Sequence, residues 1–196
     1  MRRIVSAMNA DCLQQLVSRR AWLAFEIAVL GVLCAYTLGH LAPAKILTDS
    51  MTIGGDTPAH NYLATHLKEQ FFTHGRIVSW APGWWAGFPA FQFYFFLPYL
   101  MIALLSLVLP FNIAFKLINV IGIVALPGAA YLSSRFMRLP RPIPILMAIA
   151  MLPFLFVKSH TMWGANIYST LAGMIANSLS FAIMLLTVGS WWRDAE

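Results

Sequence analysis

The chain has 196 residues, of which 60% are apolar and only 10% are charged, and it includes 14 Phe and 7 Trp. An ordinary soluble domain cannot hide that much apolar surface, so the composition excludes this class. The net charge of +6 would suit nucleic-acid binding, but the arginines gather before the first hydrophobic segment and in one short loop, as the positive-inside rule expects. We therefore expect a lipid bilayer, and no nucleic acid, as a partner.

Long stretches of the chain lack Asp, Glu, Lys and Arg, and each crossing of the hydrocarbon takes about 20 such residues. These stretches show no alternation of period two, so only helices can satisfy their backbone in lipid. We predict an all-α integral membrane protein with four or five hydrophobic helices, organised as a basic cytoplasmic tail, one membrane domain and a short C-terminal end. The predicted ranges are 1–21 for the tail, 22–192 for the domain with segments at about 22–41, 92–109, 111–133, 142–157 and 172–192, and 193–196 for the end.

The first hydrophobic segment, 22–41, has features of both a signal peptide and an anchor. The run Ala42-Pro43-Ala44 resembles a small-residue cleavage site, whereas the long tail and the later segments favour an uncleaved anchor. We expect an anchor with a cytoplasmic N-terminus in the inner membrane of a bacterium. Glu26 is embedded in this segment, near its cytoplasmic end, where we expect it to reach lipid headgroups or to pair with Arg19 or Arg20.

Residues 43–91 form a long polar loop that we place on the extracytoplasmic side. Asp56 followed by Pro58 is typical of a helix start, with Asp56 as the N-cap. Apolar residues then recur every four positions up to Gly75, which predicts an amphipathic helix lying in the membrane interface. The members of this stripe are Ala59, Leu63, Leu67 and Phe71, while Asn61, His66, Lys68 and Glu69 fall away from it.

The next segment, 80–89, is too rich in Gly and Pro for a helix and too aromatic for an ordinary solvent loop. It contains Trp84 and Trp85, which have two interpretations. They can form part of an aromatic belt at the headgroup level, or they can be a wall that stacks on a sugar or a lipid carrier. Both alternatives place the segment against an apolar surface.

The number of crossings conflicts with the arginines if every segment spans the membrane. With a cytoplasmic N-terminus and five crossings, the loop containing Arg135, Arg138 and Arg141 would lie outside, against the positive-inside rule. The segment 92–109, which Pro98 interrupts and Pro110 closes, could instead enter and leave on one side. Four segments would then cross, and we prefer this arrangement.

Three motifs resemble the N-terminal part of multispanning glycosyltransferases of the GT-C superfamily, in particular the bacterial and archaeal membrane proteins described as 6-pyruvoyl-tetrahydropterin-synthase-related. The similarity extends from about residue 20 to the end. The motifs are Gly54-Gly55-Asp56-Thr57-Pro58-Ala59-His60, Trp80-Ala81-Pro82-Gly83-Trp84-Trp85-Ala86-Gly87-Phe88-Pro89, and Trp163-Gly164-Ala165-Asn166-Ile167-Tyr168-Ser169-Thr170-Leu171-Ala172-Gly173.

The resemblance implies that Asp56 acts where a sugar is moved from a polyprenyl-phosphate carrier to an acceptor. A carboxylate there can be a general base or can hold a divalent cation against the carrier phosphate. His60 follows one helical turn later and could assist, although an interfacial histidine needs no such role, and helix capping alone would also explain Asp56. On this reading Trp84, Trp85, Lys158, His160 and Asn166 contact the substrate.

Two departures from the resemblance support a second hypothesis. The similar proteins continue the third motif with a glutamate and an aromatic residue, where this chain has Met174-Ile175-Ala176-Asn177, and they extend over several more spans. The chain is therefore either a glycosyltransferase fragment or split subunit that needs a second polypeptide, or a non-catalytic subunit of a larger membrane complex, for example an energy-transducing one. Transport is disfavoured because, apart from Glu26, the spans carry no interior acid or base.

Overall fold

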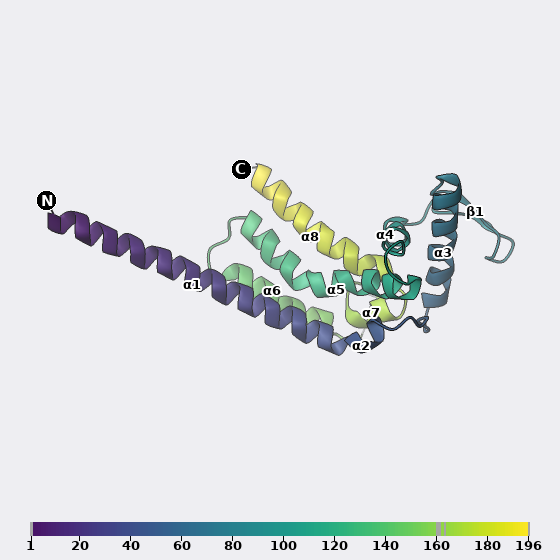
Figure 1. Ribbon diagram of the computed structural model, residues 1–196, viewed down its shortest axis with the longest axis horizontal. Coiled ribbons are helices and arrows are strands. Elements are labelled where there is room, and N and C mark those ends of the chain that lie inside the picture. The colour runs from purple at the N-terminus through teal and green to yellow at the C-terminus, as the bar shows by residue number, and fades with distance from the viewer. Residues whose placement is uncertain (1, 160–161, 163, 196) are drawn as a thin grey trace.

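The computed structural model describes the backbone of residues 2–159, 162 and 164–195, and the side chains within these ranges from Ser18 onward (Figure 1). This part of the chain is mostly helical, as predicted, with one short hairpin of two strands. The helices are α1 (Arg2–His40), α2 (Pro43–Ile46), α3 (Thr57–His74), α4 (Leu97–Leu105), α5 (Phe111–Phe136), α6 (Ile143–Leu155), α7 (Ile167–Leu171) and α8 (Ile175–Ala195), and the strands are β1 (Ser79–Ala81) and β2 (Phe88–Ala90).

Four helices form an apolar bundle in which α1 and α6 run in one direction while α5 and α8 run in the other (Figure 1). Arg141 precedes α6 and contacts Glu26 in α1, whereas Phe156 follows α6 and its ring lies 4.9 Å from that of His40 at the end of α1. The helices α5 and α8 approach closely because two glycines face the partner helix: a Cβ at Gly122 would meet the backbone of Leu179, and one at Gly189 would meet Ser133.

Three helical stretches in the described part of the chain are long and apolar enough to cross a membrane: Ser18–His40, Phe111–Phe136 and Ile175–Ala195. This count corrects the prediction of four or five. Segment 92–109 contains only the nine residues of α4, and segment 142–157 contains the 13 residues of α6. At 1.5 Å per residue these helices reach about 14 Å and 20 Å, whereas the hydrocarbon core is about 30 Å thick. The sequence overestimated these helices because long-range packing decides how much of an apolar run is helical.

Glu26 faces the bundle interior and is only 1% exposed. Its carboxylate accepts a hydrogen bond from the Tyr131 hydroxyl at 2.9 Å and pairs with Arg141 at 3.2 Å and Arg135 at 3.6 Å. The expected partners Arg19 and Arg20 are exposed instead. Glu26 has these partners because α5 and the loop after it bring their arginines to the inner face of α1. No local sequence pattern could indicate this contact.

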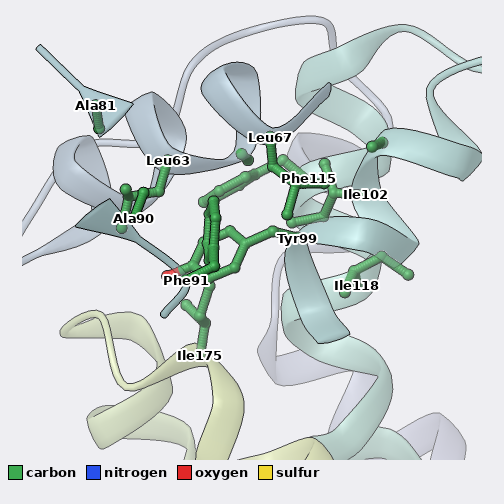
Figure 2. Packing of buried hydrophobic residues seen from close by; sticks show 12 residues of the cluster. Leu63, Leu67, Ala81, Ala90, Phe91, Tyr99, Ile102, Phe115, Ile118 and Ile175 are labelled. Carbon is green, nitrogen blue, oxygen red and sulfur yellow. The ribbon is translucent and has the colours of Figure 1, made fainter. Parts of the chain in front are cut away.

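A second unit lies at the opposite end of the bundle from the arginine loop and consists of α3, the hairpin and α4 (Figure 1). Its core gathers around the ring of Tyr99 from α4, which packs among residues of α3, the segment after β2 and α5 (Figure 2). The buried members labelled there include Leu63, Leu67, Phe91, Ile102, Phe115 and Ile175. Ile175 begins α8, so this unit is packed directly onto the bundle.

Helix α3 begins and ends where the sequence predicts, after Asp56 and before Gly75, which has the left-handed φ of 65° that suits a helix end. The prediction of an exposed polar face is partly wrong, because Asn61 and His66 are buried. His66 is covered by the hairpin, and its Nε2 lies 2.8 Å from the Ser79 hydroxyl. The hairpin therefore shields a side of the helix that sequence periodicity assigns to solvent.

Candidate functional site

Asp56 occupies the N-cap position of α3, yet its carboxylate makes no capping hydrogen bond. The backbone around it is fixed instead by the turn between α7 and α8: the Asp56 N–H donates to the Ala172 carbonyl at 3.0 Å. A Cβ at Gly55 would clash with that same carbonyl, and one at Gly173 would meet Asp56 itself, so both positions require glycine. The carboxylate is thus left exposed on a rigid turn.

The hairpin is attached to α3 by two hydrogen bonds that position its loop. The Gly83 N–H donates to the Tyr62 hydroxyl at 2.8 Å, and His66 bonds Ser79 as described above. The Trp80 indole packs over Gly87, where a side chain would not fit. These contacts hold Trp84 over α3, with its ring centroid 6.1 Å from that of Phe88.

Asp56 and Trp84 border the same cavity, which has a volume of about 290 Å³. Its floor comes from the first turns of α3 and its walls from the hairpin and the segment before α4. The lining residues are Asp56, Ala59, His60, Leu63, Trp84, Phe88 and Tyr94. One carboxylate thus faces a space bounded mainly by aromatic and aliphatic side chains, which is the usual make-up of a small-molecule site.

His60 is buried, and hydrogen bonds fix its ring at the base of this cavity. Nδ1 lies 2.6 Å from the Tyr99 hydroxyl, and the backbone of Gly173 also bonds the ring. Burial lowers the pKa of His60 below its usual value, and the Gly173 bond and the charge of Asp56 only partly oppose this effect. The ring is thereby held between Tyr99 of α4 and the turn before α8.

Tyr94 is a cavity residue that the sequence did not single out. Burial raises the pKa of Tyr94, the hydrogen bond with the Tyr99 hydroxyl partly opposes this, and the nearby charge of Asp56 adds to the increase. The chain from Tyr94 through Tyr99 to His60 therefore places a protonated phenol near the carboxylate. Tyr94 lies in a run of aromatic residues, and nothing in the sequence shows which of them faces inward.

The remaining predicted site residues lie elsewhere. Trp85 is 95% exposed and does not line the cavity. Lys158 is exposed, with its ammonium 5.9 Å from the centre of the Tyr168 ring. Asn166 is fully buried and caps α7, where its Oδ1 accepts from the Ser169 N–H at 2.7 Å. His160 falls outside the described residues.

The donor atoms around Asp56 provide few ligands for a cation. Among the residues that the structure describes, no group of three His, Cys, Asp or Glu side chains could hold a metal ion. His60 is buried and its Nδ1 bonds Tyr99, so the exposed ligand in the cavity is the one carboxylate of Asp56. A Mg²⁺ ion commonly combines one or two carboxylates with substrate phosphates, so a cation at Asp56 would depend on ligands from outside this cavity.

Searches against family models, curated proteins and solved structures find no match for this chain. The similarity to GT-C glycosyltransferases therefore remains a prediction from the three motifs. Two of those motifs meet in the structure, because Asp56 and Trp84 line one cavity, and the third contributes the turn at Ala172 and Gly173 that holds Asp56.

Proposed function

We propose that the chain is part of a GT-C-type membrane glycosyltransferase, either a fragment or a split subunit, and that the cavity at Asp56 accommodates the reacting sugar. The observation that carries the proposal is an exposed carboxylate, released from helix capping, on the edge of an aromatic cavity at one end of an apolar helix bundle. Aromatic faces suit the apolar face of a sugar ring, and a carboxylate suits proton removal from its hydroxyl.

In the proposed reaction Asp56 is the general base. An acceptor hydroxyl attacks the anomeric carbon of a sugar attached to a polyprenyl phosphate while Asp56 takes up its proton. A new glycosidic bond forms as the bond between that carbon and the phosphate oxygen breaks, and the electron pair leaves with the carrier phosphate. Trp84 and Phe88 orient the ring, and His60 is a positioning residue because its neutral imidazole holds Tyr99 and the Gly173 turn.

The proposed orientation places this chemistry outside the cytoplasm of a bacterium. The ends of α5 and α8, the start of α6 and the middle of α1 share one end of the bundle, with Arg135, Arg141 and Arg193. The positive-inside rule assigns that end to the cytoplasm and the Asp56 cavity to the other side of the inner membrane. A second membrane chain would complete the site, and we propose that the exposed Lys158 contacts the carrier phosphate.

The proposal can be tested in cells with the chromosomal copy replaced by Asp56→Asn. We expect the extracytoplasmic glycan that depends on this gene to disappear, because the amide cannot accept the proton, while the amount of protein in the membrane stays constant. Asp49→Asn is the matched control: Asp49 lies in the same loop, does not line the cavity, and accepts a hydrogen bond from Asn112 at 2.9 Å. A glycan that persists in the Asp56→Asn strain would contradict a role in transfer.

A non-catalytic subunit of a membrane complex is the second candidate, and the third motif favours it. Its residues are used in packing: Asn166 caps α7, the Gly164 N–H donates to the Ser169 hydroxyl at 3.1 Å, and Met174 stands where a second carboxylate is expected. This candidate predicts a stable complex with other membrane chains after gentle detergent extraction, in the wild type and in Asp56→Asn alike. A chain that is always extracted alone would contradict it.

A further inference from the structure

A second cavity, of about 350 Å³, lies on the other side of the start of α3 from the Asp56 site. It is enclosed by α2, α5, α7 and the loop before α3; α2 and α7 lie beside α5 at that end of the bundle (Figure 1). Thr57 borders this cavity while its neighbour Asp56 borders the first. The proposed sugar reaction makes no use of this space.

The cavity carries positive charge and no negative charge, because its lining includes Lys45 and Lys116 but no Asp or Glu. Lys116 is 7% exposed, and its ammonium donates to the carbonyl oxygens of Lys45 and Thr48. These neutral acceptors satisfy its protons without cancelling its charge, and no ion pair to Lys116 occurs among the described residues. The ammonium of the exposed Lys45 is left to contact an anion directly.

Asn119 lines the same cavity and carries an unused hydrogen-bond acceptor. Its Oδ1 is buried and has no hydrogen-bond partner within the described part of the protein. A buried amide oxygen without a partner is destabilising, so a bound group that donates a hydrogen bond to it would be favoured. An anion that also carries a hydroxyl therefore matches both Lys45 and Asn119.

The edge of the cavity is apolar and open. Ile53 is 85% exposed and Leu171 is 56% exposed, and both line it next to the exposed Lys45. Ile53 belongs to the loop before α3, and Leu171 ends α7, at the end of the apolar bundle. Exposed apolar residues beside a basic cavity at this level are the surroundings in which the head group of a lipid meets its acyl chains.

We propose that this cavity binds the head group of an anionic phospholipid that carries a hydroxyl, as phosphatidylglycerol does. The phosphate lies at Lys45 within the field of Lys116, a glycerol hydroxyl donates to Asn119 Oδ1, and the acyl chains pass over Ile53 and Leu171. The site is independent of sugar transfer and requires only that the bundle lies in a membrane. The bound lipid fastens the loop before α3 to α5 and α7.

The test compares three lipids with identical acyl chains by native mass spectrometry of the full chain in a neutral detergent. Phosphatidylglycerol has the charge and the hydroxyl, phosphatidylethanol has the charge without the hydroxyl, and phosphatidylcholine has no net charge. We expect phosphatidylglycerol to bind most tightly, phosphatidylethanol several-fold more weakly, and phosphatidylcholine most weakly. Lys45→Gln should weaken phosphatidylglycerol binding about fivefold. Lys68→Gln is the control and should leave that binding unchanged, because the Lys68 ammonium lies over the Phe111 ring, outside the cavity.

The hydroxyl contact is tested separately with Asn119→Leu, which removes the amide oxygen. In this variant phosphatidylglycerol and phosphatidylethanol should bind equally, because only the hydroxyl distinguishes them. If Asn119→Leu fails to fold, the proposal is still tested by two results: the ratio of the wild-type affinities for these two lipids, and the affinity of Lys45→Gln for phosphatidylglycerol. Equal binding of the two anionic lipids by the wild type, or binding unchanged by Lys45→Gln, would overturn the proposal.

Discussion

At the scale of single residues, Asp56 and His60 lie one helical turn apart but have different surroundings. The Asp56 carboxylate is exposed and makes no capping hydrogen bond, while His60 is buried and its ring bonds Tyr99. The sequence could suggest the pair because residues four apart share a helix face. It could not separate their roles, since Tyr99 and Gly173 are distant in the chain.

The burial of His60 predicts an acid-sensitive fold. Its pKa is lowered in the folded protein, so the unfolded chain binds the proton more readily, and stability is fully present above about pH 6.5 and declines as the pH falls below that value. His60→Gln keeps hydrogen-bonding groups without a titrating ring and should flatten this decline. Thermal unfolding in detergent between pH 7.5 and 5.5 measures it.

The comparison needs one control, because burial also lowers the pKa of His66. His66→Gln should remove a separate part of the acid-induced loss of stability. The variant with both substitutions should show the smallest change of stability with pH. If His60→Gln unfolds with the same pH dependence as the wild type, then His60 is not held neutral by its surroundings.

At the scale of elements, the sequence predicted the positions of the hydrophobic segments better than the lengths of their helices. The sequence placed the bounds of α3 and the non-helical aromatic segment, because Asp56, Pro58 and Gly75 act locally. It overestimated the segments around α4 and α6, where long-range packing decides how much of an apolar run is helical. The β-hairpin and the buried face of His66 also depend on contacts that no local pattern encodes.

The packing of α5 against α8 predicts that Gly122→Ala is destabilising. The added methyl group would meet the backbone of Leu179, which cannot move without shifting α8. We expect a loss of about 1–3 kcal/mol in the free energy of unfolding, measured by unfolding in mixed micelles. Gly128→Ala on the same helix meets nothing within 4 Å and should be neutral or stabilising; equal losses for both would contradict the close contact.

At the scale of the whole molecule, the pairs around Glu26 gather the basic loop at one end, and the turn at Gly173 fixes the candidate site at the other. The arrangement predicts that the two ends lie on opposite sides of a membrane. The sequence reached this layout from the positions of its arginines alone. It could not supply the contacts that enforce it, because each joins segments far apart in the chain.

Single cysteines test this layout in a background without Cys12 and Cys34. Trp85→Cys replaces a side chain that is 95% exposed on the hairpin, and Asp194→Cys lies at the opposite end, on an exposed last turn of α8. A membrane-impermeant maleimide added to intact cells should label the cysteine at 85 and should reach the one at 194 only after the membrane is opened. Labelling of both in intact cells would contradict the orientation.

The most direct measurement for the central claim is the rate of sugar transfer from a polyprenyl-phosphate donor in membranes that contain this chain. If Asp56 is the general base, Asp56→Asn should slow transfer by about 10²–10⁴-fold, while Asp49→Asn should leave the rate unchanged. Transfer by Asp56→Asn at the wild-type rate, with equal protein in the membrane, would contradict the assignment of this cavity as the site of transfer.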